Sequence, residues 1–595
     1  MRKGSLAGYG LAVGLAFSAA ELAAQEVTLQ TDHARSALRA ASLLLALEDD
    51  AVPQDYVAAA RADYRRLLTA LYAEGYYSGA VSITLDGVEA AGIAPLAAPR
   101  SIGNVVISVD TGERFTFGAV SIAPLPQGTT LETDLGPREV ARSGLIEDAV
   151  RGAIASWRDV GYAKVSVQDQ SVVARHNANE LDVSIRLAPG PRLRFGNLVV
   201  SGNETVTDAR IRQIAGLPVG DVFSPAEIAA AERRLRRTGT FESVSLTEAE
   251  LIGPEDTLAI NAQIVEAKPR RIGAGAEISS IEGLTLSGYW LHRNFLGGAE
   301  RFRLDAEISG IAGETGGTDY RLAANFTRPA VFGPDTEYFL QGEILREDEE
   351  DYLIDKISVE TGFSRIITED LTVRAGVGLL RAREVVDGDE RAYTLLTLPL
   401  DATYDRRNDP ANATEGYFID VSATPFIGID GDLAGARTFA DLRGYLTFGE
   451  TDNFTIAGRG QVGAVFGAEI DEAPVDYLLY SGGGGTVRGQ PYRSLGVTTM
   501  QGMDTVTTGG LSFIGAQLEA RYLVRENISV VGFYDWGYVG ETSTPGTEGD
   551  WHAGTGLGVR YNTGIGPIRL DLGTPASGDK AFEELQVYIG IGQAF

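Results

Sequence analysis

The residues that could carry out chemistry are few in this chain of 595 residues, which has no cysteine and only four histidines. Without thiols there is no thiolate nucleophile and no cysteine-bound metal. The histidines are His33, His176, His292 and His552. They are scattered, with no i, i+4 pair for a metal, and no Gly-x-Ser-x-Gly elbow of a serine hydrolase occurs. The sequence therefore predicts no catalytic residue, no metal site, no cofactor and no enzyme.

The strongest local motif is the glycine-rich stretch at residues 482–496, which contains Val487-Arg488-Gly489. Its four consecutive glycines suggest a phosphate-binding loop, but the stretch lacks Gly-Lys-Ser/Thr and does not join a strand to a helix. Arg488 is the more promising residue, because a planar guanidinium can bind two carboxylates at once. The alternative is an ordinary arginine on an exposed loop.

Acidic residues dominate the charge of the chain. There are 81 Asp and Glu against 51 Lys and Arg, a net charge of −30. This surface repels the phosphates of nucleic acid, so we predict no nucleic-acid partner. The densest acidic run is at residues 347–351. It is expected to be a solvated loop, with a divalent-cation site as the alternative, since carboxylates alone do not define a coordination geometry.

The first residues have the three-part layout of a secretory signal. A basic start is followed by an apolar stretch at residues 11–17 and then by small residues. We expect cleavage after Ala20 or Ala24 and assign residues 1–24 to the signal peptide; a buried first helix is the alternative. No later stretch reaches the roughly 18 uncharged apolar residues of a spanning helix. If the chain enters a membrane, it must do so as a β-barrel.

An internal repeat divides the N-terminal half. The sequence at residues 111–118 returns 78 residues later, at 189–196, with Gly, Arg, Phe and Gly in register. Three times, a glycine closes an amphipathic helix and precedes a strand, as a helix end that needs positive φ would require; these are Gly75, Gly161 and Gly239. Each unit is thus predicted to contain a strand, then helices, then two further strands. We predict three α+β modules, at residues 25–110, 111–190 and 191–268.

The C-terminal part, residues 269–595, has no helical period. Short segments alternate apolar and polar residues instead, for example at 371–377 and 568–572. This alternation is typical of transmembrane strands with lipid outside and water inside. A soluble β-sandwich would alternate too, but about 16 segments with alternately short and long connections favour the outer-membrane arrangement. We therefore predict an antiparallel transmembrane β-barrel of about 16 strands.

The glycine-rich stretch resembles a motif of a known superfamily of outer-membrane assembly and translocation barrels, which includes BamA, TamA and the two-partner secretion translocators. The motif is the Val-Arg-Gly-aromatic sequence of the sixth extracellular loop, here Val487-Arg488-Gly489. Gln490 replaces the aromatic residue, whereas Tyr492 and the following Ser-Leu-Gly look like the TamA-type version. By our strand count the loop joins the eleventh and twelfth strands, where the superfamily places it.

Two strand motifs extend this resemblance. Residues 533–537, Phe-Tyr-Asp-Trp-Gly, look like the superfamily's Phe-x-Asp-x-Gly motif, and residues 517–521 look like the acidic strand before it. In the superfamily the loop folds back into the barrel and its arginine pairs with these acids. The resemblance thus implies strand-motif residues Phe533 and Gly537, and a lock between loop and lumen made of Val487, Arg488, Gly489, Glu519 and Asp535.

Both ends of the mature chain fit the same superfamily. The repeated modules resemble POTRA domains, its periplasmic modules, and three is the TamA-type count, whereas BamA resembles five in a longer chain and the two-partner translocators two with a plug helix. The chain ends in an alternating segment that stops on Phe595. This ending looks like the C-terminal signal by which outer-membrane barrels are recognised for insertion.

The first and last predicted strands must pair to close the barrel, and both carry glycines at alternate positions. These are Gly273 and Gly275 in the first strand and Gly590 and Gly592 in the last. Glycine has no side chain to pack across the two strands, and its backbone gains conformational entropy when the strands separate. This seam is therefore predicted to be the weakest strand pairing in the barrel. The alternative is that the glycines relieve crowding at a tightly curved wall.

The resemblance implies an outer-membrane factor, with its modules in the periplasm, that helps β-rich, autotransporter-like clients insert into or cross the membrane without nucleotide, through the barrel seam. Its implied partners are outer-membrane lipids, unfolded outer-membrane or secreted clients, and an inner-membrane protein of the TamB type. Alternatives are a BamA-like general insertase or a two-partner secretion translocator. A passive porin and an outer-membrane hydrolase are the rivals from other functional classes.

Overall fold

The computed structural model describes residues 26–595, apart from short gaps at 49–50, 96–97, 132–133, 280–282, 314–315, 350–351, 387, 450–451, 502–503, 565 and 579–580. The predicted signal peptide, residues 1–24, lies outside the described residues. The chain forms two compact units, one mainly of residues up to Phe195 and the other mainly of residues from Gly196 to Phe595.

The N-terminal unit begins with a four-stranded sheet covered by helices. Its elements are β1 (Glu26–Thr31), α1 (Arg35–Ala41), η1 (Leu44–Ala46), α2 (Pro53–Ala73), β2 (Ala80–Leu85), β3 (Val88–Glu89), η2 (Ala90–Gly92) and β4 (Asn104–Asp110). The strand order is β1-β4-β2-β3, with β1 parallel to β4. Leu67 and Leu71 lie four residues apart on α2 and are fully buried against the sheet, together with Ile83 and Ile107. Gly75 ends the helix at a φ of +90°, as glycine readily allows.

A second small sheet follows in the same unit. Its elements are β5 (Thr116–Ala123), α3 (Ser143–Asp159), β6 (Ser166–Arg175) and β7 (Glu180–Ala188), in the strand order β5-β7-β6. Alternate residues of β7 are buried at 1–2% exposure, and they are Leu181, Val183, Ile185 and Leu187. They pack against α3 because side chains of a strand alternate between its two faces. β6 is one of the two edge strands, and nearly all of its side chains are exposed.

The third small sheet has the strand order β8-β10-β9. Its elements are β8 (Arg194–Ser201), α4 (Asp208–Ala215), α5 (Pro225–Arg237), β9 (Phe241–Glu248), η3 (Pro254–Asp256) and β10 (Thr257–Glu266). Helices α4 and α5 bury Ile211, Ile214 and Leu235. We call residues 191–268 the third module. It leads directly into the large sheet of the C-terminal unit.

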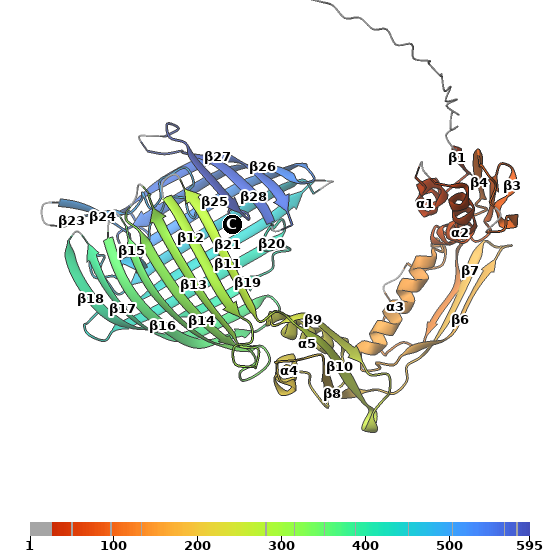
Figure 1. Cartoon of the computed structure of the whole chain (residues 1–595), viewed down its shortest axis with the longest axis horizontal. Coiled ribbons are helices and arrows are strands. Elements are labelled where there is room, and N and C mark those ends of the chain that lie inside the picture. The colour runs from red at the N-terminus through yellow and green to blue at the C-terminus, as the bar shows by residue number, and fades with distance from the viewer. Residues whose placement is uncertain are drawn as a thin grey trace, which may run out of the picture. The chain divides into compact units, whose positions relative to one another are not determined.

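The C-terminal unit is dominated by one antiparallel sheet whose strands curve round into a barrel wall (Figure 1). Its strands are β11 (Arg270–Ser279), β12 (Gly283–His292), β13 (Arg301–Ile311), β14 (Asp319–Arg328), β15 (Thr336–Asp348), β16 (Tyr352–Ile366), β17 (Leu371–Val386), β18 (Asp389–Thr397), β19 (Leu400–Asp405), β20 (Gly416–Gly428), β21 (Ala434–Phe448), β22 (Phe454–Phe466), β25 (Ser512–Arg525), β26 (Ile528–Gly540), β27 (Gly549–Thr563), β28 (Gly566–Pro575) and β29 (Gln586–Ile591). Each strand follows its sequence neighbour in the sheet.

The 17 segments of this sheet amount to 16 strands across the wall. β18 and β19 both pair with β17 and with β20, so they are two parts of one strand. The break falls at Leu398 and Pro399, because proline has no N–H to donate to the ladder. The predicted barrel of about 16 antiparallel strands is therefore confirmed.

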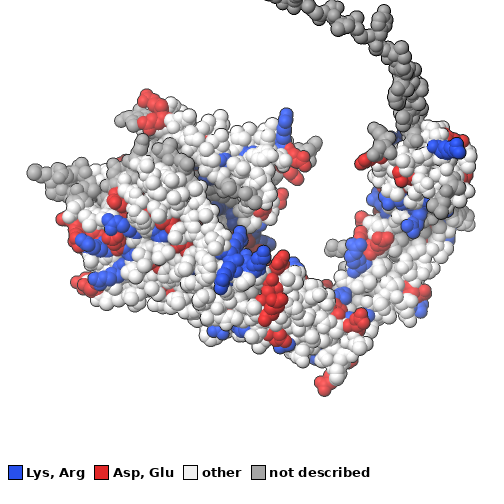
Figure 2. Space-filling model, viewed as in Figure 1, with Lys and Arg blue, Asp and Glu red and all other residues white. Residues whose placement is uncertain are grey.

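Exposed aliphatic and aromatic side chains cover the outer wall. In β17, for example, Val377 and Leu379 are each 50% exposed, whereas the alternate residue Leu380 is 7% exposed. Figure 2 shows a visible wall that is mostly uncharged, with Lys, Arg, Asp and Glu gathered toward its ends. Such a belt is typical of a wall in contact with lipid. Among the described residues no helix is long and apolar enough to cross a membrane.

The ends of the large sheet differ from the prediction. The sheet order runs from β11 to β29, and within the described residues these two strands are not hydrogen-bonded to each other. The expected pairing of first and last strand is therefore not present in this structure. Gly592 was also expected inside the last strand. It lies beyond the end of β29 at a φ of +98°, and its N–H donates to the carbonyl oxygen of Pro567 at 2.7 Å.

Candidate functional site

A long loop, residues 467–511, joins β22 to β25, the eleventh and twelfth strands when β18 and β19 count as one. It contains η4 (Val475–Tyr477) and a small hairpin of β23 (Val497–Gln501) and β24 (Asp504–Thr508). Antiparallel bridges join Leu479 to Gly510 and Ser481 to Leu495. Because these bridges close the loop on itself, the segment between Ser481 and Leu495 forms a compact tip, which carries Arg488.

Arg488 is 1% exposed and binds three carboxylates from three different strands. Its Nε and Nη2 donate to the two oxygens of Asp535 on β26, at 2.7 and 3.0 Å. Its backbone N–H also donates to Asp535, at 3.1 Å. Nη1 donates to Glu519 on β25 at 2.6 Å and to Asp571 on β28 at 3.2 Å. The structure thus brings together the predicted Arg488, Glu519 and Asp535, and it adds Asp571.

Two further arginines complete this buried group of charges. Arg521 Nε donates to Glu519 Oε2 at 2.8 Å, and Arg560 pairs with Asp571. Arg560 Nη2 also lies 3.5 Å from Glu519 Oε1. We call the six residues Arg488, Arg521, Arg560, Glu519, Asp535 and Asp571 the lumen charge cluster. Its three guanidinium groups balance its three carboxylates, as buried charges require.

The strand motif around Phe533 makes room for the tip. The guanidinium carbon of Arg488 lies 3.7 Å from the centre of the Phe533 ring, a cation–π contact. A Cβ atom on Gly537 would overlap Ser481, and one on Gly554 would overlap the carbonyl oxygen of Arg488. Glycine at position 537 leaves space for the Ser481 side chain, and glycine at position 554 lets the loop backbone come this close.

Val487 and Gly489 flank the arginine and have separate roles. Val487 is fully buried. Gly489 has a φ of +91°, and a Cβ there would overlap the carbonyl oxygen of Thr574 on β28. Its N–H donates to the Tyr588 hydroxyl on β29 at 3.0 Å. Gln490, in place of an aromatic residue, donates to a backbone carbonyl of β27 at 2.8 Å. The tip therefore contacts the last strands of the sheet.

Comparison with known proteins agrees with this geometry. Residues 294–595, just over half of the chain, match the Omp85 superfamily domain. The chain belongs to the Omp85 superfamily. Residues 193–267 match the POTRA domain, described as a surface antigen variable number repeat. An Omp85 barrel joined to a POTRA module is an outer-membrane protein with that module in the periplasm.

Two outer membrane protein assembly factors named BamA are related in sequence. The one from Nitratidesulfovibrio vulgaris is 23% identical over 439 residues, which cover 70% of this chain and 53% of that protein. The one from Neorickettsia risticii is 20% identical over 524 residues, 82% of this chain and 68% of that protein. The chain thus spans about half the length of the first relative.

A solved structure shows the same fold. It is BamA from Haemophilus ducreyi lacking POTRA domains 1–3, with a TM-score of 0.63 and 17% sequence identity. The match covers 80% of this chain and 99% of that one. At this identity the likeness supports the architecture of this Omp85 chain and leaves its clients open.

The loop of this Omp85 barrel has a second anchor that the sequence did not reveal. Arg493 donates to the Tyr352 hydroxyl at 2.6 Å and to Glu347 at 3.0 Å, and it lies 3.3 Å from Glu349. The described part of the acidic run, residues 347–349, is therefore not simply a solvated loop, because Glu347 and Asp348 belong to β15 and Glu347 is bound by the loop tip. Among the described residues no group of three or more His, Cys, Asp or Glu side chains could hold a metal ion.

A third set of contacts holds the start of the loop. Lys356 of β16 forms a 2.7 Å ion pair with Asp476 of η4. Arg391 of β18 donates to the backbone carbonyls of Asp471 and Ala473. The loop is therefore fixed at its start, at Arg493 and at Arg488, on opposite parts of the wall.

Side chains from neighbouring strands lie directly over three of the predicted seam glycines. A Cβ on Gly273 would overlap the ring of Tyr289, and one on Gly275 would lie 2.8 Å from the Ser287 hydroxyl. On the other edge, a Cβ on Gly590 would lie 3.1 Å from Arg569 Nε. These contacts favour the relief of crowding as the role of the glycines, and a role in seam opening stays a prediction.

The C-terminal residue is not free. Phe595 is 6% exposed and packs with Ala413, Tyr445 and Ala457. The guanidinium carbon of Arg521 lies 5.6 Å from its ring centre. The end of the chain thus reaches the lumen charge cluster in the folded barrel. Its role as an insertion signal concerns the unfolded chain and stays a prediction.

The third module is docked on the periplasmic turns of the barrel through charged contacts. Arg234 of α5 binds both oxygens of Asp335, at 2.8 to 3.1 Å, and Arg237 binds Asp335 at 3.1 Å. Arg210 of α4 donates to the carbonyl oxygen of Pro329 at 2.7 Å. Burial would raise the pKa of Asp335, but the two arginines outweigh it and hold the pKa below its usual value.

We expect Arg488→Ala to release the loop tip. The substitution leaves the buried carboxylates of the cluster without their central cation, a loss of about 3 kcal/mol of stability. Proteinase K added to the purified full chain should then cleave within residues 482–496, which we expect to be protected in the wild type because Val487 and Arg488 are buried. Arg525→Ala, at an exposed arginine, is the control. Equal protection of the loop in Arg488→Ala and wild type would contradict the assignment.

We expect the docking of the third module to weaken in acid. Because the folded pKa of Asp335 lies below its unfolded value near 3.9, the carboxylate stabilises the junction fully above about pH 4, and this contribution is lost as the pH falls through the folded pKa. Spin labels on α5 and on the 329–335 turn should report wider distance distributions at low pH.

The matched variant is Asp335→Asn, which should give the wide distribution already at pH 7 and change little on acidification. Asp256→Asn, an exposed carboxylate of the same module, should behave like the wild type. The same pH dependence in Asp335→Asn and wild type would show that another group controls the junction.

Proposed function

We propose that this Omp85 protein helps β-rich client proteins insert into or cross the outer membrane, without nucleotide, by offering them the edges of β11 and β29. The observation that carries this proposal is that these two strands are not paired with each other among the described residues. Unpaired N–H and C=O groups are costly inside a bilayer, where water cannot satisfy them. A client strand would satisfy them by adding to the sheet.

The periplasmic modules fit the delivery of such clients. We infer that the three small sheets are three POTRA-type modules, at residues 25–110, 111–190 and 191–268, of which the last matches the family. In the second, β6 is an exposed edge strand whose Val172 and Val173 are 39% and 52% exposed. Such an edge can accept an extended segment through backbone hydrogen bonds.

The TamA-type role, with autotransporter-like clients and a TamB-type inner-membrane partner, is our choice within the superfamily. It rests on the module count and on the Tyr492-Arg493-Ser494-Leu495-Gly496 sequence after the lock motif. A general insertase is the second candidate, because both curated relatives are named outer membrane protein assembly factors. A passive porin fits less well, since the loop tip and the lumen charge cluster occupy the barrel interior.

A reversible crosslink across the seam tests the proposal. Ala274→Cys in β11 and Ile589→Cys in β29, each scanned with its neighbours to find the register, should form a disulfide in the full-length protein in proteoliposomes. We expect the disulfide to stop the assembly of an unfolded autotransporter barrel added as client, and reductant to restore it.

The control is a disulfide between strands that are already paired. Ala402→Cys and Val421→Cys are register partners in β19 and β20 and should leave assembly unchanged. If a confirmed seam crosslink leaves client assembly intact, the protein does not work through this edge. If wild-type protein assembles no client but conducts ions as an open channel, the porin is the better description.

A further inference from the structure

The outer wall formed by β13 to β18 has a defined apolar limit. One row of register partners faces outward and is entirely apolar, and it consists of Leu304, Ala324, Gly342, Val359, Leu379 and Leu396. Val359 and Leu379 are each 50% exposed, which places this row on the lipid side. The row marks the part of the wall that meets hydrocarbon.

The next outward row, farther from the third module, carries a cation. It consists of Ala306, Leu322, Ile344, Ile357, Arg381 and Thr394. Leu322, Ile344 and Ile357 are 50–55% exposed, and Arg381 lies beside Ile357. A guanidinium thus stands level with exposed aliphatic side chains, where an isolated charge needs an anionic partner.

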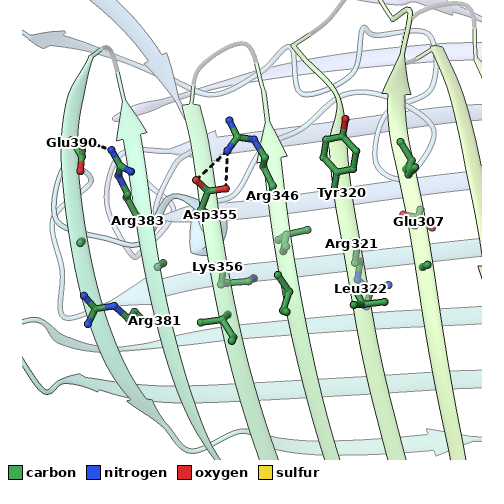
Figure 3. A pocket seen from close by; sticks show the side chains of 17 residues that line it. Glu307, Tyr320, Arg321, Leu322, Arg346, Asp355, Lys356, Arg381, Arg383 and Glu390 are labelled. Carbon is green, nitrogen blue, oxygen red and sulfur yellow. Dashed lines mark hydrogen bonds and ion pairs between the residues drawn. The ribbon is translucent and has the colours of Figure 1, made fainter.

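The row beyond it adds two more arginines, Arg346 and Arg383. Each is paired with a carboxylate, Arg346 with Asp355 at 3.0 Å and Arg383 with Glu390 at 2.6 Å (Figure 3). All four side chains are 44–59% exposed. Ion pairs this exposed are weak, so both arginines can turn toward a stronger anion.

Arg381 differs from these two because it forms no ion pair with a described residue. Its Nη1 donates to the hydroxyl of Thr394 at 3.2 Å, a neutral partner. Thr394 in turn donates to Asp430, whose carboxylate also attracts Arg381 at longer range but does not line the cavity. The positive charge of Arg381 therefore remains available on the side that faces Ile357.

A shallow cavity of about 930 Å³ lies over this part of the wall. Its outward lining joins Leu322, Ile344 and Ile357 to the three arginines. Arg321 and Lys356 lie behind the strands in that view, on the lumen side. The cavity is thus apolar toward the hydrocarbon and cationic toward the far end of the barrel, which is the arrangement that an anionic amphiphile needs.

We propose that Arg381, Arg383 and Arg346 form a binding site for a phosphate-bearing acylated lipid of the outer leaflet, with its acyl chains on Leu322, Ile344 and Ile357. The arginines stand at the end of the strands opposite the periplasmic turns that hold the third module, and therefore at the outer leaflet. A guanidinium binds two phosphate oxygens at once and is always charged. The three local arginines attract an anionic headgroup, whereas a zwitterionic headgroup offers them no net charge.

Lipid binding to the full chain in detergent tests this site independently of client assembly. Diphosphoryl lipid A is the probe, and native mass spectrometry measures how much remains bound. We expect Arg381→Gln combined with Arg383→Gln to weaken lipid binding by about tenfold. Arg381→Lys should weaken it less, because lysine keeps the positive charge but cannot bind two phosphate oxygens at once. Arg321→Gln, on the lumen face of the same wall, is the matched control and should bind as the wild type does.

Comparison with other lipids identifies the class of ligand. Phosphatidylcholine should bind more weakly than the probe, and monophosphoryl lipid A should fall between them. Unchanged binding by the double variant, or wild-type binding no tighter than that of phosphatidylcholine, would overturn the site. Displacement of the probe by equimolar inorganic phosphate would show a soluble-anion site instead. The migration of unheated samples on electrophoresis shows whether each variant is a folded barrel. If the double variant does not fold, the single variant Arg381→Gln is tested in its place.

Discussion

The buried pairing of Arg488 with Glu519, Asp535 and Asp571 constrains how the rest of the barrel is built. Three carboxylates from separate strands face one another inside the wall at 0% exposure, and they would repel each other without cations between them. Arg521 and Arg560 come from the wall itself, but the third guanidinium comes from the loop. The loop must therefore enter the barrel, where the Ser481 side chain fills the space beside Gly537 and the Arg488 carbonyl oxygen fills the space beside Gly554.

The same pairing connects the loop to one edge of the proposed seam. Gly489, next to Arg488, contacts Thr574 on β28 and Tyr588 on β29. Phe595, at the end of the chain, lies against Arg521 of the same cluster. The position of the loop tip and the position of the last strand are thus fixed by neighbouring atoms. A change that releases the tip would also remove the hydrogen bond from Gly489 to Tyr588 of the last strand.

The barrel and the centre of the site could be predicted because each leaves a local mark in the sequence. Alternation reveals the strands, and the motifs around Arg488 and Asp535 resemble a known pattern. Asp571 and Arg560 could not be found this way, since one charged residue in an alternating strand looks like any other lumen residue. Arg493 and Glu347 are 146 residues apart, and no local pattern joins them. Alternate glycines such as Gly273 look the same in a paired and an unpaired strand, so the open ends of the sheet were not foreseen.

A double-mutant cycle between Arg488 and Asp535 tests the central claim most directly. The unfolding free energy of the folded full chain would be measured in urea for the wild type, Arg488→Ala, Asp535→Ala and the double variant. If the loop is held by this buried pair, the losses of unfolding free energy in the two single variants do not add up to the loss in the double variant. The coupling energy is then about 2 kcal/mol or more. Losses that add to within about 0.5 kcal/mol would show that the two residues act independently, and would contradict the account.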